Sequence, residues 1–109
     1  MFNVEEFFKA NKRLEPKDIE GFGQVWISEL DCQQFDKISM VPNKLHQSLR
    51  LIIATACDQE GKPIFKDEDL PKLNALPIGR ILPLLNACNE VNNLSMEEDD
   101  LLGKSGGIE

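Results

Sequence analysis

A polar block at residues 58–70 separates two apolar stretches and so decides where the helices of this chain can begin and end. Before the block, apolar side chains recur at helical spacing and predict a helix over residues 44–57, with a stripe made of Leu45, Leu49, Ile52, Ile53 and Ala56. Inside the block, Gly61 predicts a turn and Asp67 predicts the N-cap of a further helix. The chain must therefore bury its apolar side chains between short helices, although periodicity alone also allows a buried strand over residues 51–55.

A leucine-rich helix is expected after the block, over residues 77–92. Pro77 suits a first helical position, and Pro83 predicts a kink or a restart because proline lacks a backbone donor. The predicted buried side of this helix consists of Ile78, Ile81, Leu82, Leu85, Cys88 and Val91. We expect the helix that begins at Asp67 to carry three leucines that face inward: Leu70, Leu73 and Leu76.

The N-terminal part predicts a short helix followed by a β-hairpin. Asn3 can cap a helix whose apolar face is made of Val4, Phe7 and Phe8. Residues 14–20 and 24–30 are predicted to be extended, and the glycines Gly21 and Gly23 predict the turn between them. A lone hairpin is marginally stable in water, so one of its faces must lie on helices or on another chain.

A third short helix is predicted to begin at Asp31, which has capping-box spacing, and to end before Pro42. Its inward side chains are predicted to be Phe35, Ile38 and Met40. Asn43 can cap the helix that follows. Together these elements predict an α+β, mostly α-helical fold, in which an N-terminal antiparallel β-hairpin packs on four to five short helices. We expect one domain over residues 1–94 and an acidic C-terminal tail over 95–109 that is disordered in isolation.

The charge of the chain argues against nucleic acid as a partner. The formal net charge is -7, and the few neighbouring bases near the N-terminus are flanked by acids, which is typical of a solvated face. The longest apolar stretch, residues 51–54, is too short to span a bilayer. The N-terminus lacks the basic and apolar regions of a signal peptide. We therefore expect a cytosolic protein with no nucleic-acid partner and no membrane partner.

Three cysteines and one histidine are the candidates for chemistry. Cys32, Cys57 and Cys88 show no CxxC spacing, and their odd number argues against structural disulfides. A thiol enzyme would need His46 beside Cys57 or Cys88, and no nucleophile motif surrounds either cysteine. Ligand spacing for a metal is also missing. We expect no enzyme activity, no metal and no cofactor, and we keep a thiol enzyme as a competing hypothesis.

Candidate partner-binding residues lie in the block, shortly after it, and near the C-terminal end. Phe65 either packs locally as a hydrophobic staple, which we favour, or anchors a partner. The acidic tail is either a solvated terminus or a segment that orders on binding. The candidate residues are Phe65, Leu70, Leu73, Glu97, Glu98, Asp99 and Asp100.

In their order and motifs, the elements between residues 21 and 94 resemble the tail assembly chaperones of long-tailed bacteriophages. The most specific piece is the block, which has the pattern D-x-E-G-K-P-x-F-x-D-E-D. A Gly-Phe-Gly turn, a strand and Glu29-Leu30 precede it, and a leucine-rich helix that ends in residues 86–94 follows it. Pro83 departs from the family pattern, and the phenylalanine-rich N-terminus has no counterpart in it.

The resemblance implies a non-enzymatic protein of the host cytoplasm that is absent from the mature virion. Such a protein would bind the tape measure protein, keep that apolar rod soluble and help the tail tube to polymerise. The major tail tube protein would be a further partner, and the chaperone would also self-associate. The alternative is another small phage structural or adaptor protein that acts through protein–protein interaction.

Overall fold

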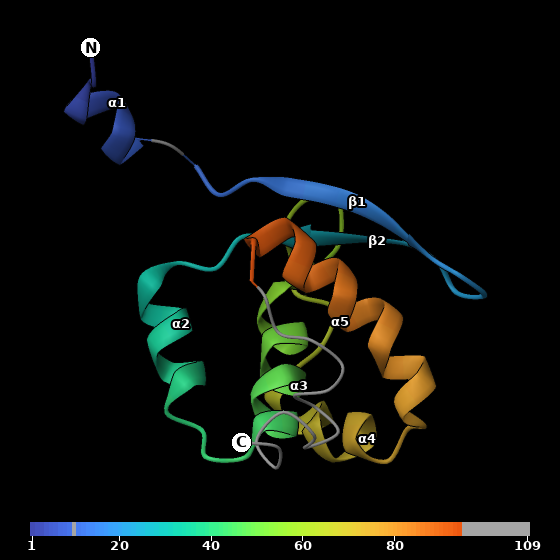
Figure 1. Ribbon diagram of the computed structural model, residues 1–109. Helices are drawn as coiled ribbons and strands as arrows, with labels where there is room; N and C mark the ends of the chain where they lie inside the picture. Colours follow the sequence, from blue (N-terminus) through green and yellow to red (C-terminus); the bar gives the residue numbers. More distant parts are fainter. Residues whose placement is uncertain (10, 95–109) are drawn as a thin grey trace, which may run out of the picture.

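The computed structural model describes residues 1–9 and 11–94, and within them short helices pack on a three-stranded sheet (Figure 1). The elements in chain order are α1 (Val4–Lys9), β1 (Leu14–Ile19), β2 (Gly23–Ser28), α2 (Cys32–Ser39), α3 (Lys44–Thr55), β3 (Ala56–Cys57), the 3₁₀ helix η1 (Asp67–Asp69), α4 (Leu70–Asn74) and α5 (Ile78–Asn92). This α+β, mostly helical arrangement with an N-terminal hairpin confirms the predicted fold class.

The predicted hairpin is present, and a third strand extends it. β1 and β2 pair in antiparallel fashion around a turn in which Gly21 and Gly23 have positive φ angles of 86° and 96°. The two residues of β3 pair with the end of β2, so α3 ends at Thr55 and is two residues shorter than predicted. Residues 51–55 are helical, which excludes the alternative of a buried strand there.

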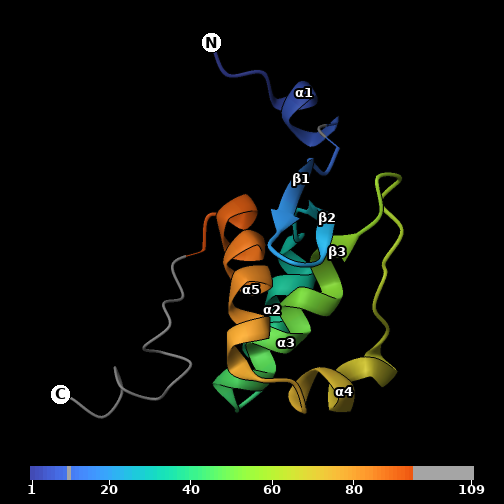
Figure 2. The ribbon, with the colours of Figure 1, turned by 90° about the vertical axis from the view of Figure 1, so that its right-hand side faces the viewer.

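The helices form a layer under the sheet. α5 runs beneath the hairpin, α3 packs beside α5, and α2 and α4 pack against α3 (Figures 1 and 2). The apolar side chains with the least exposure lie where these elements meet: Ile27, Leu49, Ile52, Ala56, Leu85, Cys88 and Val91. The core therefore joins β2, α3 and α5, in agreement with the predicted stripes of the two long helices.

Several side chains that were predicted to point inward lie at the surface. Phe35 and Met40 are exposed, and only Ile38 of the three on α2 packs against the core. Ile78 is also exposed. The predictions were wrong because helical periodicity identifies an apolar side, whereas burial also needs a neighbouring element there. α2 is a short helix that packs on α3, and Ile78 begins α5.

Two predicted helix starts are shifted. Asp67 is not the N-cap: the cap position is Lys66, whose backbone N–H donates to the Asp69 carboxylate at 2.9 Å, and Asp67 begins the 3₁₀ turn. The prediction was wrong because the block contains several acids, and the side chain of Asp69 is the one that accepts a hydrogen bond from the backbone of Lys66. Pro77 precedes α5 as its N-cap. α5 then runs without a restart through Pro83, which lies on its exposed side.

Hydrogen bonds hold the end of α5 to the residues that flank the hairpin, opposite its turn. The Arg13 guanidinium donates to the Val91 carbonyl at 2.6 Å. Asn92 accepts from the backbone N–H of Leu30 at 2.7 Å and donates to the Ser28 carbonyl at 3.2 Å. These bonds tie the last turn of α5 to the end of the hairpin that lies opposite its turn.

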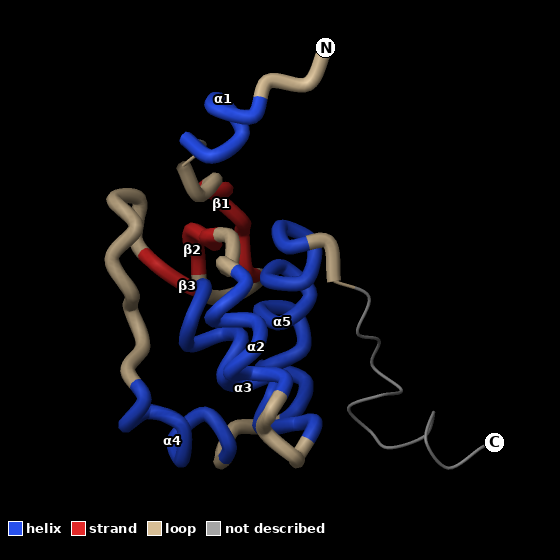
Figure 3. The backbone as a smooth tube through the Cα atoms, turned by 90° about the vertical axis from the view of Figure 1, so that its left-hand side faces the viewer, coloured by secondary structure: helices blue, strands red, loops and turns tan. Residues whose placement is uncertain are grey.

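The first nine residues form an arm that stands apart from the helical layer (Figure 3). The predicted helix is confirmed as α1, and the Asn3 side chain caps it by accepting from the Glu6 backbone N–H at 3.1 Å. None of its residues is buried. We refer to residues 1–9 as the N-terminal arm.

Candidate functional site

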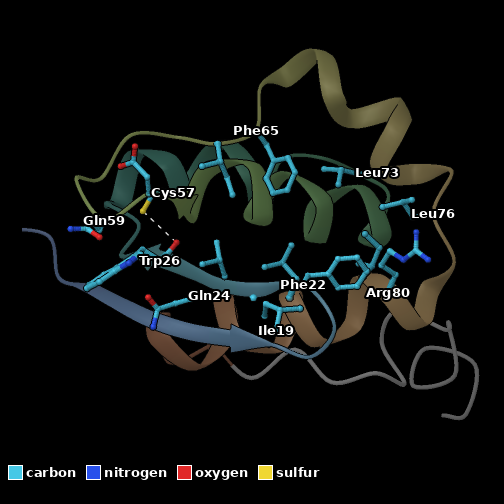
Figure 4. Close-up of a pocket in the computed structure, with 16 residues that line it drawn as sticks. Ile19, Phe22, Gln24, Trp26, Cys57, Gln59, Phe65, Leu73, Leu76 and Arg80 are labelled. Carbon is cyan, nitrogen blue, oxygen red and sulfur yellow. Dashed lines mark hydrogen bonds between the residues drawn. The ribbon is translucent and has the colours of Figure 1, made fainter.

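An apolar groove lies between the turn end of the hairpin, the segment that follows β3, and the start of α5. Its volume is about 580 Å³. We call residues 58–66, which connect β3 to η1, the strap (Figure 2). The apolar side chains around the groove are Ile19, Phe22, Val25, Trp26, Ile64, Phe65, Leu73, Leu76, Ile81 and Leu84 (Figure 4).

The hairpin supplies one wall of the groove. Ile19 and Val25 lie on strands β1 and β2 and pack against the core, so they form its floor on this side. Phe22 lies in the turn between the two positive-φ glycines and is 68% exposed. A phenylalanine in such a turn has no strand neighbour to cover it, which leaves its ring at the rim of the groove.

The strap supplies the second wall, and its own hydrogen bonds fix its course. The Asp58 backbone N–H donates to the Lys62 carbonyl at 2.9 Å, and Gly61 takes a positive φ of 87°. The Asp58 carboxylate accepts from the backbone N–H groups of Glu60 at 2.8 Å and Lys62 at 3.0 Å. The hydrogen bond that the Lys62 backbone N–H donates to this carboxylate is the main cause of the lowered pKa of Asp58. The predicted turn is confirmed, and the Asp58 carboxylate stabilises it.

Beyond this turn, the strap returns to the sheet and positions the next two side chains. The Ile64 backbone N–H donates to the Ala56 carbonyl at 3.3 Å, which holds Ile64 and Phe65 beside β3. Phe65 is half-buried and packs against the core, and its ring also borders the groove (Figure 4). Phe65 precedes the cap residue Lys66, and Leu70 is the fourth residue after that cap, which is the spacing of a hydrophobic staple.

The structure divides the predicted partner-binding residues into three groups. Phe65 and Leu73 both line the groove, with Leu73 contributing a buried side chain from α4. Leu70 packs against the core and is not part of the groove lining. The four acids of the tail, Glu97, Glu98, Asp99 and Asp100, lie outside the described residues. Partner binding by any of them stays a prediction.

Sequence reasoning missed most of the groove lining, and three of the missed residues stand out. Trp26 and Phe22 come from the hairpin, and the Arg80 guanidinium lies 5.5 Å from the centre of the Phe22 ring. Such a stacked arrangement is favourable because the ring face is electron-rich. The Gly-Phe-Gly turn was a usable signal for an exposed aromatic ring. No sequence signal indicated Arg80, because only the fold brings the start of α5 to the hairpin turn.

The groove is poor in reactive groups. Its acidic and basic side chains among the described residues are Asp58 and Arg80. The Cys57 thiol contacts the Trp26 carbonyl at 3.4 Å, and burial raises its pKa, so it stays protonated at neutral pH. A protonated thiol is a poor nucleophile. The groove is therefore suited to holding apolar side chains.

The histidine that the competing thiol-enzyme hypothesis needs lies elsewhere. His46 is in the first turn of α3, whereas Cys88 contacts Thr55 at the last residue of that helix. A rise of about 1.5 Å per residue separates His46 from Thr55 by roughly 13 Å along the axis. Cys57 lies beyond Thr55, at the end of β3. The structure does not bring His46 to either buried thiol.

The described part of the chain offers no grouping of side chains for a metal. No cluster of three or more His, Cys, Asp or Glu side chains in residues 1–9 and 11–94 could hold a metal ion. Within the same residues, each helix is too short or too polar to cross a membrane.

The fold is similar to that of a known phage protein. The solved structure of the bacteriophage HK97 tail assembly chaperone superposes with a TM-score of 0.59, at 16% sequence identity. The likeness covers 81% of this chain and 95% of that chain. No family model matches the sequence, and comparison with curated proteins finds no significant match. At this identity the likeness shows a shared fold.

Proposed function

We propose that this protein is a tail assembly chaperone, which binds the tape measure protein of a long-tailed phage in the apolar groove. The observation that carries the proposal is the groove itself, on a fold shared with the HK97 tail assembly chaperone. The motif of the polar block supports it independently, because that block forms the strap wall of the groove.

The chemistry of the groove suits an amphipathic helix. A tape measure protein is a long helical rod whose apolar stripes would aggregate if left exposed. Docking such a stripe between the hairpin and the strap would bury it against Trp26, Phe65 and Leu73, which is the helix-in-groove mode of recognition. A volume of about 580 Å³ accommodates only a few side chains of the rod. Many copies would therefore line one rod and keep it soluble while the tail tube polymerises.

The rest of the assignment follows from this role. The protein works by binding and not by catalysis, acts in the host cytoplasm together with the major tail tube protein, and leaves before the virion is complete. Its net charge of -7 would help to keep the complex soluble. Mass spectrometry of purified virions checks the last step: we expect the tape measure protein to be present and this chain to be absent.

Co-expression with the tape measure protein tests the proposal directly. We expect the wild-type chain to keep the tape measure protein in the soluble fraction and to co-purify with it. The double variant Phe22→Ser/Ile64→Ser should fail, because it replaces two exposed apolar side chains of the groove without touching the core.

Met40→Ser is the matched control for this experiment. Met40 is 76% exposed at the end of α2, outside the groove, so the variant should behave as the wild type does. Circular dichroism verifies that all chains are folded. A tape measure protein that stays insoluble with the wild-type chain, or that is rescued equally by the groove variant, contradicts the proposal.

A further inference from the structure

The two ends of the apolar groove carry opposite charges. In Figure 4, Trp26 and Gln59 lie at one end of the groove, and Asp58 directly precedes Gln59 in the chain. Arg80 lies at the other end, beside the Phe22 ring. The side chains that line the groove between these ends are mostly apolar. The groove therefore has a negative end and a positive end.

The positive end presents a guanidinium that is held in place without a carboxylate partner. The Arg80 guanidinium lies 5.5 Å from the centre of the Phe22 ring, and it forms no ion pair within residues 1–9 and 11–94. Its side chain is exposed, so an incoming group can reach it. A guanidinium binds a carboxylate through two parallel N–H groups, and the stack on Phe22 restricts the side chain beforehand.

The negative end presents a carboxylate that only the strap backbone holds. Asp58 accepts from the backbone N–H groups of Glu60 and Lys62, and both bonds reach the same oxygen, Oδ1. These bonds, above all the one from Lys62, lower the pKa of Asp58 and so keep the carboxylate ionised at neutral pH. The carboxylate forms no ion pair with the part of the chain that the structure describes. Glu60 and Lys62 do not line the groove, and their opposite charges offset each other.

The distance between the two ends corresponds to a short stretch of helix. Trp26 and Phe22 are four residues apart along the hairpin, which is roughly 13 Å of extended chain. A helix rises about 1.5 Å per residue and covers this length in about nine residues. Two side chains that flank such a stretch on the same helix face are about eleven residues apart.

We propose that the groove selects its guest by charge: it takes an apolar helical stripe that is flanked by a carboxylate at one end and by a lysine or arginine at the other. The carboxylate would bind Arg80, the cation would bind Asp58, and aliphatic side chains would fill the space between them. Each such guest lies in one direction only, because the two ends of the groove differ in charge. The inference rests on the proposed function, since it specifies which segments of the tape measure protein the groove holds.

Selection by charge would also reject helices that are equally apolar. A helix with acids at both ends places a carboxylate against Asp58, and a helix with bases at both ends places a cation against Arg80. Each of these arrangements is repulsive. Repulsion of the wrong partner gives specificity to a surface whose apolar side chains alone cannot distinguish one amphipathic helix from another.

Binding of synthetic helical peptides tests the inference. The sole tryptophan, Trp26, lines the groove, so its fluorescence reports occupation. The peptides have about 18 residues, which is long enough for a helix, with blocked ends and one shared leucine stripe. At the two flanking positions they carry glutamate and lysine, two glutamates, two lysines, or two glutamines. At low salt, we expect the wild type to bind the glutamate–lysine peptide roughly threefold to tenfold more tightly than the glutamine peptide. High salt should reduce this preference.

Charge variants of the two residues show whether they cause the preference. Arg80→Glu should bind the two-lysine peptide most tightly, because both ends of its groove are then negative. Asp58→Asn should no longer distinguish the glutamate–lysine peptide from the two-glutamate peptide, and its amide oxygen can still accept from the strap backbone. Lys44→Glu and Glu60→Gln are the matched controls, because they change the net charge by the same amounts outside the groove lining. Both controls should keep the wild-type preference.

The outcomes separate this inference from the proposed function. Equal binding of all the peptides by the wild type overturns the inference, and the groove would still hold apolar helices. A preference that Arg80→Glu and Asp58→Asn leave unchanged overturns it as well. A wild-type chain that binds none of the peptides contradicts the proposed function too, because the groove then holds no helix. Circular dichroism verifies that each variant is folded, and the comparison of the peptides on the wild type needs no variant.

Discussion

Cys88 shows how strongly one buried residue can depend on its surroundings. Its side chain is fully buried on α5 and contacts Thr55 of α3, and burial raises the pKa of its thiol to about 12. Sequence periodicity already placed Cys88 on the predicted buried side of its helix, and Cys88 is buried, as is Cys57. Cys32, in contrast, is exposed at the start of α2. The two buried cysteines act as small apolar side chains.

The raised pKa predicts a loss of stability at alkaline pH. In the unfolded chain the Cys88 thiol ionises above its ordinary pKa of 9.0, whereas in the folded chain it stays protonated up to about pH 12. The unfolded state therefore releases its proton first, and the free energy of unfolding should fall by about 1.4 kcal/mol per pH unit between these values. Urea denaturation at several pH values measures this slope. Cys88→Ala is the control, and an equal slope in both proteins contradicts the prediction.

Among the elements, the strap depends most on local backbone geometry. Its turn places Gly61 at a φ of 87°, where a side chain is strained, even though an added Cβ would meet only ordinary contacts with Leu14. Gly79 is the opposite case, because it is the second residue of α5 and has open space around the position of a Cβ. The same substitution should therefore have opposite effects at the two positions.

We expect Gly61→Ala to lower the free energy of unfolding by about 1 kcal/mol, because alanine is strained at positive φ. Gly79→Ala should raise it by roughly 0.5–1 kcal/mol, because alanine is a better helix former than glycine. Chemical denaturation of the two variants beside the wild type measures both values. A change of the same sign in the two variants would show that the strap turn or the start of α5 differs from the structure described above.

Elements with a local signal were predictable, and elements made by tertiary pairing were not. The capping box of α2 is formed as expected, with Asp31 accepting from the Gln34 backbone N–H at 2.8 Å. The Asn43 cap of α3 accepts from the His46 backbone N–H at 3.0 Å. β3, however, contains only two residues, and it exists because β2 lies beside it. A run of that length has no periodicity that could reveal it.

For the molecule as a whole, the candidate site was the least predictable part. The sequence identified Phe65 and Leu73, which are near each other in the chain. Trp26 and Arg80 join them only after the hairpin has been placed over α5. Such a placement depends on bonds between distant residues, such as the one between Arg13 and Val91, and nothing in a single sequence indicates these.

The hydrogen bond between Arg13 and Val91 also bears on how the molecule is made. During translation the hairpin leaves the ribosome before the helices that pack beneath it, and a hairpin alone is only marginally stable. The helix that supports it, α5, emerges last among the described elements. The hairpin therefore gains the support of α5, and the bond from Arg13 to Val91, only after the rest of the described chain has been made.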